Sequence, residues 1–321
     1  EINGFLAWNK SPKYNFVYDQ VVGYGELLST TIVNAFLNKS GITCEFLDVR
    51  NFIKTDSNYR DVKVNWEKTQ ERVYKGINKG KLYITEGFLG SDDNNFTTTL
   101  GRVCSDYTAA ILAYCLNAES VTIWKDVPGV LNADPRYFNE AQLLNRISYR
   151  EAIELAFYGA SVIHPKTLQP LQRKEIPLRV KSFLNPEDPG TTVGKGVKIE
   201  PEVPCFIVKK NHVLMKLSSL DFSFIVEDSI GDLFKLLHDY KMKVDLIQNS
   251  AISFSVCVDN SLGRLEDLLD HLKGKFNVVH FEGVSLYTIR HFNTEAIESL
   301  QNGREVLLEQ RGRETIQLVV K

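Results

Sequence analysis

The sequence of 321 residues lacks two features that would identify its partners directly, a long apolar run and an excess of positive charge. A helix that spans a bilayer needs roughly 18 or more consecutive apolar residues, and the sequence contains no such run. Lysine and arginine total 38 against 40 aspartate and glutamate residues, so the basic stripe typical of nucleic-acid binding is missing. We therefore expect neither a membrane nor a nucleic-acid partner.

Cysteine and histidine are also scarce and scattered. The sequence has five cysteines without a CxxC pair and six histidines without ligand spacing, so it predicts neither a zinc site nor a disulfide framework. We expect no protein-bound metal, and we interpret the cysteines as buried thiols of a cytoplasmic protein. They are Cys44, Cys104, Cys115, Cys205 and Cys257.

The remaining composition is that of a globular protein. Hydrophobic residues make up 43% and charged residues 24% of the chain, and its length allows two or three compact units. The first residue is Glu1 rather than methionine, so we expect the sequence to begin inside a larger protein.

The N-terminal half alternates predicted helices with predicted strands. Apolar residues recur at helical spacing from Leu27 to Leu37, and Gly41 stands where that helix would stop. Further elements follow, namely strands at 42–50, 81–90 and 120–127 and a helix at 106–118. The alternation predicts an α/β fold in which a largely parallel sheet is covered by helices.

A helix at 147–160 and a strand at 176–183 complete this half. Ser148 and Glu151 have the spacing of a capping box at the start of the helix. Four of the ten prolines then fall between 185 and 204, which predicts a domain boundary.

After this boundary the pattern changes to two smaller α+β units. The first has the order strand, helix, strand, strand, helix, strand between 213 and 281, and a second, shorter unit begins near 285. The strand at 205–210 has no hairpin partner in the first unit. We expect it to join the sheet of the second unit, which makes the first unit an insertion.

The predicted helix at 106–118 begins beside a cluster of polar side chains. A helix N-terminus presents unpaired N–H groups and a partial positive charge, so it attracts phosphate or carboxylate. Arg102 adds a guanidinium suited to a carboxylate, and the hydroxyls of Ser105 and of the threonines at 97–99 add donors. Taken alone, Ser105 or Asp106 would be an ordinary N-cap.

Charged residues also gather at 124–136, where a predicted strand ends. Lys125, Asp126, Asp134 and Arg136 should reach the carboxyl edge of the parallel sheet, where open α/β folds bind ligands. A solvated loop is the alternative explanation of these charges. Cations on one loop that face an anion-binding helix start on another instead predict a polyphosphate and a second anion held together.

Three segments carry a resemblance to a known family: "GELLST", "GFLGSDDNNFTTTLGRVCSDYTAAILAYCLNAESVTIWKDVPGVLNADPR" and "YGASVIHPKTLQPLQRKEIPLRVKSF". Together they resemble aspartate kinases, members of the amino-acid kinase family, and in the first and third segments the bacterial monofunctional forms. The resemblance implies an amino-acid kinase fold, incomplete at its N-terminus, followed by two ferredoxin-like ACT units. The implied boundaries are 1–190 for the kinase part, 191–204 for a linker, 212–283 for the first ACT unit, and 205–211 with 284–321 for the second.

The resemblance also implies a reaction, the transfer of a phosphoryl group from MgATP to the β-carboxylate of L-aspartate at the start of lysine, threonine and methionine synthesis. A carboxylate is already ionised at pH 7, so it needs charge neutralisation and positioning rather than a general base. ATP phosphates and water would hold most of the magnesium coordination. The residues implied by matching positions are Arg102 and Asp106 for catalysis; Glu26, Phe88, Arg102 and Ser105 for aspartate; and Lys125, Asp126, Asp134 and Arg136 for ATP.

The sequence departs from the family pattern in several places. The opening Lys-Phe-Gly-Gly-Thr-Ser stretch is absent, so we expect no catalysis from these residues alone. Val103 and Cys104 stand where the family has two glycines, and Ser161 and Leu131 stand where it has a lysine and a tyrosine. We hypothesise that Lys125, at a position where the family usually has threonine, restores the missing cation.

The region after 204 would bind a regulatory amino acid between paired ACT units. Within "KVDLIQNSAIS", Val244 and Asp245 match the effector loop of the family, and Asp245 would accept an effector ammonium. The positions that follow differ, which leaves lysine or threonine as the effector. The alternative role for Asp245 is to cap a strand. The resemblance further implies a homodimer or a higher oligomer.

Two other interpretations remain open. The altered glycine and lysine positions would also suit an amino-acid-sensing protein with a decayed kinase site, and another amino-acid kinase with an acidic substrate is a weaker alternative. His164, which precedes a proline after a capped helix, is expected to be structural rather than catalytic.

Overall fold

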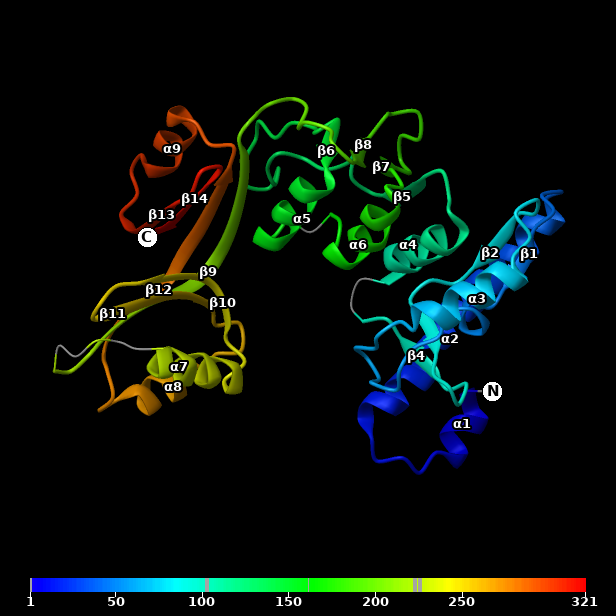
Figure 1. Ribbon diagram of the computed structural model, residues 1–321, viewed down its shortest axis with the longest axis horizontal. Coiled ribbons are helices and arrows are strands. Elements are labelled where there is room, and N and C mark those ends of the chain that lie inside the picture. The colour runs from blue at the N-terminus through cyan, green and yellow to red at the C-terminus, as the bar shows by residue number, and fades with distance from the viewer. Residues whose placement is uncertain (1, 102–103, 161, 222–223, 225–226) are drawn as a thin grey trace. The chain divides into compact units, whose positions relative to one another are not determined.

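The computed structural model describes residues 2–101, 104–160, 162–221, 224 and 227–321 (Figure 1). The chain divides into two compact units, which are described separately below. The first comprises Glu1–Gly129, Asn145–Ile153 and Val162–Lys198, and the second comprises Val130–Leu144, Glu154–Ser161 and Ile199–Lys321. Among the described helices, none is both long enough and apolar enough to cross a bilayer.

The first unit holds most of the helices. They are α1 (Ile2–Trp8), α2 (Tyr14–Lys39), the short 3-10 helix η1 (Val49–Asn51), α3 (Trp66–Gly76), α4 (Cys104–Leu116), α6 (Pro165–Lys174) and the first half of α5 (Tyr149–Tyr158). Ser148 caps α5 as its spacing predicts, since its Oγ accepts a hydrogen bond from the Glu151 N–H at 3.0 Å.

The strands of the first unit form three small sheets. β1 (Glu45–Leu47) pairs in parallel with β2 (Tyr83–Thr85), and β3 (Leu89–Ser91) pairs in antiparallel with β4 (Thr97–Thr99). The third sheet has the order β5 (Val121–Lys125), β7 (Leu178–Ser182), β8 (Thr191–Gly194), β6 (Arg146–Ser148). β8 falls inside the range expected to be a linker.

This four-stranded sheet is mixed, although a largely parallel sheet was expected. β5 pairs in parallel with β7 and β6 with β8, whereas β7 and β8 run antiparallel. The reason is the short connection 183–190, which can only return the chain as a hairpin because a parallel crossover needs a dozen or more residues. Gly190 closes the connection with a φ of +66°, and a Cβ there would lie 2.0 Å from the Val180 carbonyl oxygen.

Helix α2 starts earlier than the apolar pattern predicts and buries a different face. Gly23 is buried because the lack of a side chain lets α2 approach Leu89, whose Cδ2 would lie 3.1 Å from a Cβ at this position. The apolar residues that mark the helix in the sequence, among them Leu28, Ile32 and Phe36, are exposed. The core of this region lies instead around Val49, Leu89 and Ile111.

The second unit is built on one antiparallel sheet of six strands in the order β10-β11-β9-β12-β14-β13. The strands are β9 (Cys205–Ser218), β10 (Lys243–Asn249), β11 (Ser253–Asp259), β12 (Asn277–Arg290), β13 (Val306–Arg311) and β14 (Thr315–Val320). The helices are α7 (Glu227–Asp239), α8 (Leu265–Leu272) and α9 (Thr294–Gln301). α7 and α8 lie side by side against β10 and β11, and α9 lies beside β13 and β14 (Figure 1).

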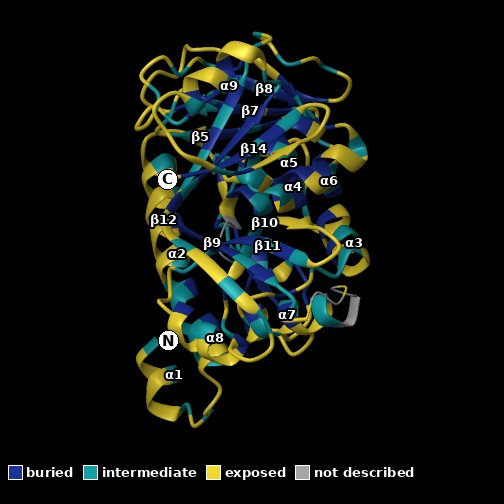
Figure 2. Cartoon of the chain, turned by 90° about the vertical axis from the view of Figure 1, so that its left-hand side faces the viewer, coloured by how far each residue is buried: buried dark blue, intermediate teal, exposed yellow. Residues whose placement is uncertain are grey.

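Two strands of 14 residues, β9 and β12, join both halves of this sheet. Their pairing runs from Asn277↔Ser218 at one end to Arg290↔Cys205 at the other, with an irregularity between Phe281 and Val284. The residues 205–209 of β9 thus pair with 286–290 of β12, which confirms the predicted pairing of the strand at 205–210. Buried residues dominate 212–217 of β9 and 284–290 of β12, whereas 277–283 of β12 are exposed or half-buried, and exposed residues prevail on the loops (Figure 2).

The cysteines of the described structure agree with the expected role of buried thiols. Cys44, Cys115, Cys205 and Cys257 are buried and form no disulfide. Burial raises the pKa of the Cys115 thiol to about 11 and that of the Cys257 thiol to about 12, so neither is an ionised nucleophile near neutral pH.

Candidate functional site

The three threonines before α4 do not offer their hydroxyls to a ligand, contrary to the prediction. Thr99 Oγ1 donates to Asp19 Oδ1 at 2.8 Å, and Thr97 Oγ1 accepts from Arg50 Nη1 at 3.1 Å. Thr98 Oγ1 lies 2.8 Å from the hydroxyl of Thr55. All three side chains are buried, and their hydrogen bonds hold strand β4 in place.

Asp19, which the sequence analysis did not identify, fastens α2 to β4. Its carboxylate is fully buried and accepts the backbone N–H groups of Thr99 at 2.9 Å and Arg60 at 3.0 Å. Burial raises the pKa of Asp19 in spite of these hydrogen bonds. Gln20 adds a second connection, because its amide exchanges two hydrogen bonds with the backbone of Thr97. These contacts fix β4 against α2.

The start of α4 contains the first pair of predicted site residues that the structure brings together. Asp106, in the first turn of α4, is 8% exposed, and its Oδ2 lies 2.7 Å from Lys125 Nζ at the end of β5. The Lys125 side chain remains 29% exposed. A fixed ammonium therefore lies at the carboxyl end of a parallel strand and beside a helix N-terminus.

A tight turn brings two further predicted residues to the same helix start. A Cβ added to Gly87 would lie 2.6 Å from the Cα of Ser105, so only glycine allows this approach. Phe88 follows with a φ of +73°, and its N–H donates to Thr108 Oγ1 at 3.0 Å. Phe88 and Ser105 thus lie close together, whereas Glu26 lies exposed on α2.

Arg102, the other predicted catalytic residue, lies outside the described residues, as do Val103 and Ser161. Asp126 is exposed directly after β5. Asp134 and Arg136 belong to the second unit, where the carboxylate accepts from Arg136 Nε at 3.0 Å and Nη2 at 2.6 Å. These hydrogen bonds lower the pKa of Asp134 and leave the guanidinium 78% exposed.

A pair of acids next to the Gly87 turn, the buried Glu86 and the half-buried Asp48, was not predicted from the sequence. Glu86 is 1% exposed, and its Oε1 accepts from the Val49 N–H at 2.9 Å. Its Oε2 receives no donor from the described residues. Burial, reinforced by the neighbouring Asp48 carboxyl, raises the pKa of Glu86 to about 7, so a proton on Glu86 joins the two acids. Burial also opposes ionisation of Asp48, but its hydrogen bonds from Arg50 prevail and lower its pKa.

The predicted effector residue Asp245 already lies beside three basic side chains of its own chain. Its carboxylate lies 2.7 Å from Lys209 Nζ, 2.8 Å from His212 Nε2 and 3.4 Å from Lys243 Nζ, and its side chain is 6% exposed. The alternative that Asp245 caps a strand is wrong, because it lies within β10 at a register shift between Val244 and Leu246. Val244 packs half-buried against the core formed with α7 and α8.

The charge state of His212 follows from its partners. Nδ1 faces the Lys210 carbonyl oxygen at 3.0 Å and Nε2 faces the Asp245 carboxylate, so both ring nitrogens must donate. Burial lowers the pKa of His212, but these two hydrogen bonds outweigh it, and the net shift is upward. The imidazolium and Lys209 together explain why the pKa of Asp245 lies far below its usual range although burial raises it.

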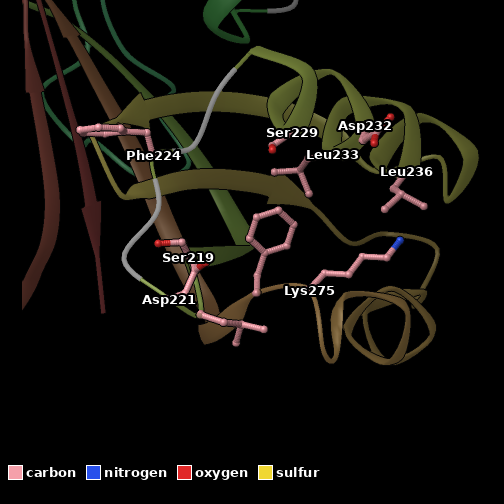
Figure 3. Close-up of a pocket in the computed structure, with 10 residues that line it drawn as sticks. Ser219, Asp221, Phe224, Ser229, Asp232, Leu233, Leu236 and Lys275 are labelled. Atoms are coloured by element: carbon pink, nitrogen blue, oxygen red, sulfur yellow. The ribbon is translucent and has the colours of Figure 1, made fainter.

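The second unit also has a hollow of about 460 Å³ beside α7. Figure 3 shows Ser229, Leu233 and Leu236 on the side of α7 that faces it, with Lys275 extending below. Its wall is both polar and apolar, and Ser219, Asp221 and Phe224 complete the rim.

His164 is structural, as expected. It is the N-cap of α6, and its Nδ1 accepts from the Lys166 N–H at 3.1 Å. Burial lowers its pKa, which keeps the ring neutral and able to accept.

Comparison with known proteins places this geometry in a family. Residues 4–182, more than half of the chain, match the model of the amino acid kinase family. The chain belongs to the amino acid kinase family. It is 36% identical over 233 residues to lysine-sensitive aspartokinase 3 of Escherichia coli, which covers 71% of this chain and 51% of that protein. The chain therefore spans about half the length of this relative.

Solved structures agree over almost the whole chain. The crystal structure of E. coli aspartokinase III in complex with lysine and aspartate covers 96% of this amino acid kinase and 73% of its own chain, with a TM-score of 0.82 and 29% identity. The structure of the same enzyme with aspartate and ADP covers 99% and 75%, with a TM-score of 0.77 and 28% identity. The α/β fold with its mixed sheet and the C-terminal antiparallel sheet is thus that of an aspartokinase.

The described part of this amino acid kinase contains no group of three or more His, Cys, Asp or Glu side chains placed to hold a metal ion. Groups that can face a nucleotide are nevertheless present. They are the ammonium of Lys125 and the exposed guanidinium of Arg136, each oriented by a carboxylate. Both are suited to phosphate oxygens.

Proposed function

We propose that this chain is an aspartate kinase that transfers the γ-phosphoryl group of ATP to the β-carboxylate of L-aspartate. The observation that carries the proposal is the Lys125–Asp106 pair at the start of α4, where the Gly87 turn also brings Phe88 and Ser105. Sequence likeness to a lysine-sensitive aspartokinase supports it, as does structural likeness to an aspartokinase with bound aspartate and ADP.

The reaction needs positive charge more than it needs a base. Aspartate is ionised at neutral pH, and its carboxylate must approach an anionic phosphate. Lys125 supplies a cation that is already held in one direction by Asp106, so little reorganisation is required when charge develops. We assign to Asp106 the positioning of this cation and to Arg102 the pairing with a substrate carboxylate.

The remaining residues divide between the two substrates. Glu26, Phe88 and Ser105 would contact aspartate, with Glu26 on its ammonium. Asp126, Asp134 and Arg136 would contact ATP, with Arg136 on phosphate, where its exposed guanidinium is accessible. Magnesium would be held mainly by ATP phosphates and water.

The second unit would regulate the kinase through tandem ACT units that pair in a homodimer or higher oligomer in the cytoplasm. Its two halves share β9 and β12, and each half carries its own helices. Lysine is the effector that we favour, because the relatives include a lysine-sensitive enzyme and a lysine complex. Its ammonium would have to compete with Lys209 for Asp245.

A coupled assay of ADP formation on the purified protein tests the proposal. ADP release that requires L-aspartate, together with hydroxamate formation from the acyl phosphate in hydroxylamine, is the expected result. Calorimetry with ATP, aspartate and lysine runs in parallel. Lysine binding without ATP binding and without turnover would contradict the proposal and favour an amino-acid-sensing protein with a decayed kinase site.

A further inference from the structure

Asn132 joins two parts of the second unit through all four of its polar groups. Its N–H donates to the Gln142 carbonyl oxygen at 2.9 Å, and its Oδ1 accepts from the Gln142 N–H at 2.7 Å. Its Nδ2 donates to the Pro204 carbonyl oxygen at 2.9 Å, and its own carbonyl accepts from the Phe206 N–H at 2.7 Å. Asn132 is 7% exposed, so losing these partners would leave buried polar groups unsatisfied.

The two hydrogen bonds to Gln142 close the base of the segment 130–144, which contains Asp134 and Arg136. This segment contains no helix and no named strand, only a bridge between Leu131 and Leu143. Its tip is a turn in which the N–H groups of Tyr137 and Phe138 donate to the Asp134 carbonyl at 3.0 Å. The position of Arg136 therefore depends on how the base is held, because no regular element fixes it.

The two other hydrogen bonds attach that base to β9. Phe206 is the second residue of β9, and its ring also packs 5.2 Å from that of Phe138. Toward α9 the segment meets a hollow of about 510 Å³ rather than a packed surface, with Glu140 and Gln142 on one wall and Glu295 and Ser299 on the other. The segment is thus anchored mainly on one strand, and Asn132 is the hydrogen-bonding centre of that anchor.

β9 continues without interruption from this anchor to the Asp245 cluster. Lys209, which binds Asp245 at 2.7 Å, lies three residues beyond Phe206, and His212 lies three residues further. One strand therefore contacts both the segment that carries Arg136 and the buried carboxylate of the regulatory sheet.

We propose that Asn132 is a positioning residue for nucleotide binding, which holds Arg136 in place by fixing the segment 130–144 to β9. This inference rests on the proposed function, since it takes Arg136 to contact a nucleotide phosphate. In this role Asn132 touches neither substrate. Its substitution changes the affinity for the nucleotide only by changing the position of the segment 130–144.

The test compares Asn132→Ala with Asn139→Ala, a matched control at an exposed position of the same segment. Asn132→Ala is expected to weaken ATP binding about tenfold while aspartate binding changes less than twofold. Amide hydrogen exchange at 131–143 should accelerate in the same variant, and Asn139→Ala should leave both measurements unchanged. Asn132→Asp keeps the acceptor for Gln142 but sets a carboxylate oxygen against the Pro204 carbonyl oxygen, so it should weaken ATP binding more at pH 8 than at pH 5, where the protonated acid can donate; this pH dependence serves if the alanine variant folds poorly.

The outcomes separate this inference from the proposed function. If the unaltered protein binds no ATP, the proposed function fails, and with it the role assigned to Asn132. If the unaltered protein binds ATP and Asn132→Ala binds it within twofold of that affinity, only the inference is overturned. An equal loss of ATP and aspartate affinity would also overturn it, because a general structural defect lowers both.

Discussion

Lys125 Nζ lies 2.7 Å from Asp106 Oδ2, which joins the end of β5 to the first turn of α4. The two residues were predicted for different roles, one on the nucleotide and one in catalysis. Their contact makes them one structural unit, in which the carboxylate orients the ammonium. Substituting either residue should therefore disturb the other.

Lys125→Ala is the direct test of the hypothesis that this lysine replaces a cation missing elsewhere. Removal of an oriented cation from a phosphoryl-transfer site should raise the KM for ATP and lower kcat/KM by on the order of a hundredfold. Lys79→Ala, at an exposed position of the same unit, is the control. An unchanged KM for ATP in Lys125→Ala would show that the compensation hypothesis is wrong.

Glu86→Gln should make the stability of the first unit less dependent on pH. The folded pKa of Glu86, about 7, lies above its ordinary value of 4.5. The folded protein therefore holds a proton that the unfolded chain releases, and stability declines as pH rises from about 4.5 to about 7. Glutamine imitates the protonated acid. The difference in free energy of unfolding between the variant and the unaltered protein should therefore shift in favour of the variant by on the order of 2 kcal/mol between pH 4.5 and pH 8.

Denaturant unfolding between pH 4 and pH 9 measures this effect, with the exposed Glu119→Gln as the control. Glu119→Gln should follow the pH profile of the unaltered protein. Parallel profiles for Glu86→Gln and the unaltered protein would mean that Glu86 is ionised in the folded state, and the acid pair with Asp48 would have to be abandoned.

His212 gives the second unit a test of the same sign, in which the charged form of the side chain, rather than the neutral form, is the stabilised one. Its folded pKa is raised above 6.5 by Asp245 and the Lys210 carbonyl. The stabilisation is fully present below pH 6.5 and is lost as pH rises through the folded pKa. His212→Gln keeps one hydrogen bond but carries no charge. The stability of this variant should therefore no longer decline as pH rises above 6.5. A histidine NMR titration that places this pKa at or below 6.5 would contradict the prediction.

The sequence predicts those features that depend on neighbours along the chain. The Ser148–Glu151 cap, the helix at α4 and the two strand-helix repeats after 204 are all local patterns, and each is present. The closeness of Phe88 and Ser105 has no signal in the adjacent sequence, because the Gly87 contact that produces it reaches across the β3–β4 hairpin.

Features that depend on distant partners were not predictable. The hydroxyl of Thr99 donates a hydrogen bond to Asp19, 80 residues away in the sequence, and the side-chain amide of Asn132 donates one to the Pro204 carbonyl, 72 residues away. Nothing in either local sequence distinguishes a ligand donor from a structural one. The bulge that turns Asp245 toward Lys209 is likewise set by the pairing of β10 with β11, which the alternation of apolar residues does not encode.

Lys209→Ala should make the second unit more responsive to lysine. Lys209 Nζ occupies one oxygen of Asp245 at 2.7 Å, in the manner that an amino-acid ammonium would. Without it, Asp245 keeps His212, and its Oδ1 keeps only the longer contact with Lys243 Nζ at 3.4 Å, so an external ammonium binds without first displacing the hydrogen bond from Lys209. The concentration of lysine needed for half-maximal effect is therefore expected to fall about tenfold, since a charge-assisted hydrogen bond need no longer be broken.

Lysine binding by calorimetry, and inhibition in the coupled assay, measure this change. Lys210→Ala is the matched control, because Lys210 lies over the Tyr137 ring, 4.1 Å from its centre, rather than on Asp245. Asp245→Asn should remove the response to lysine in both backgrounds. A Lys209→Ala protein that binds lysine no more tightly than the unaltered protein would mean that Asp245 serves only to neutralise the cations beside it, and the effector would have to bind elsewhere.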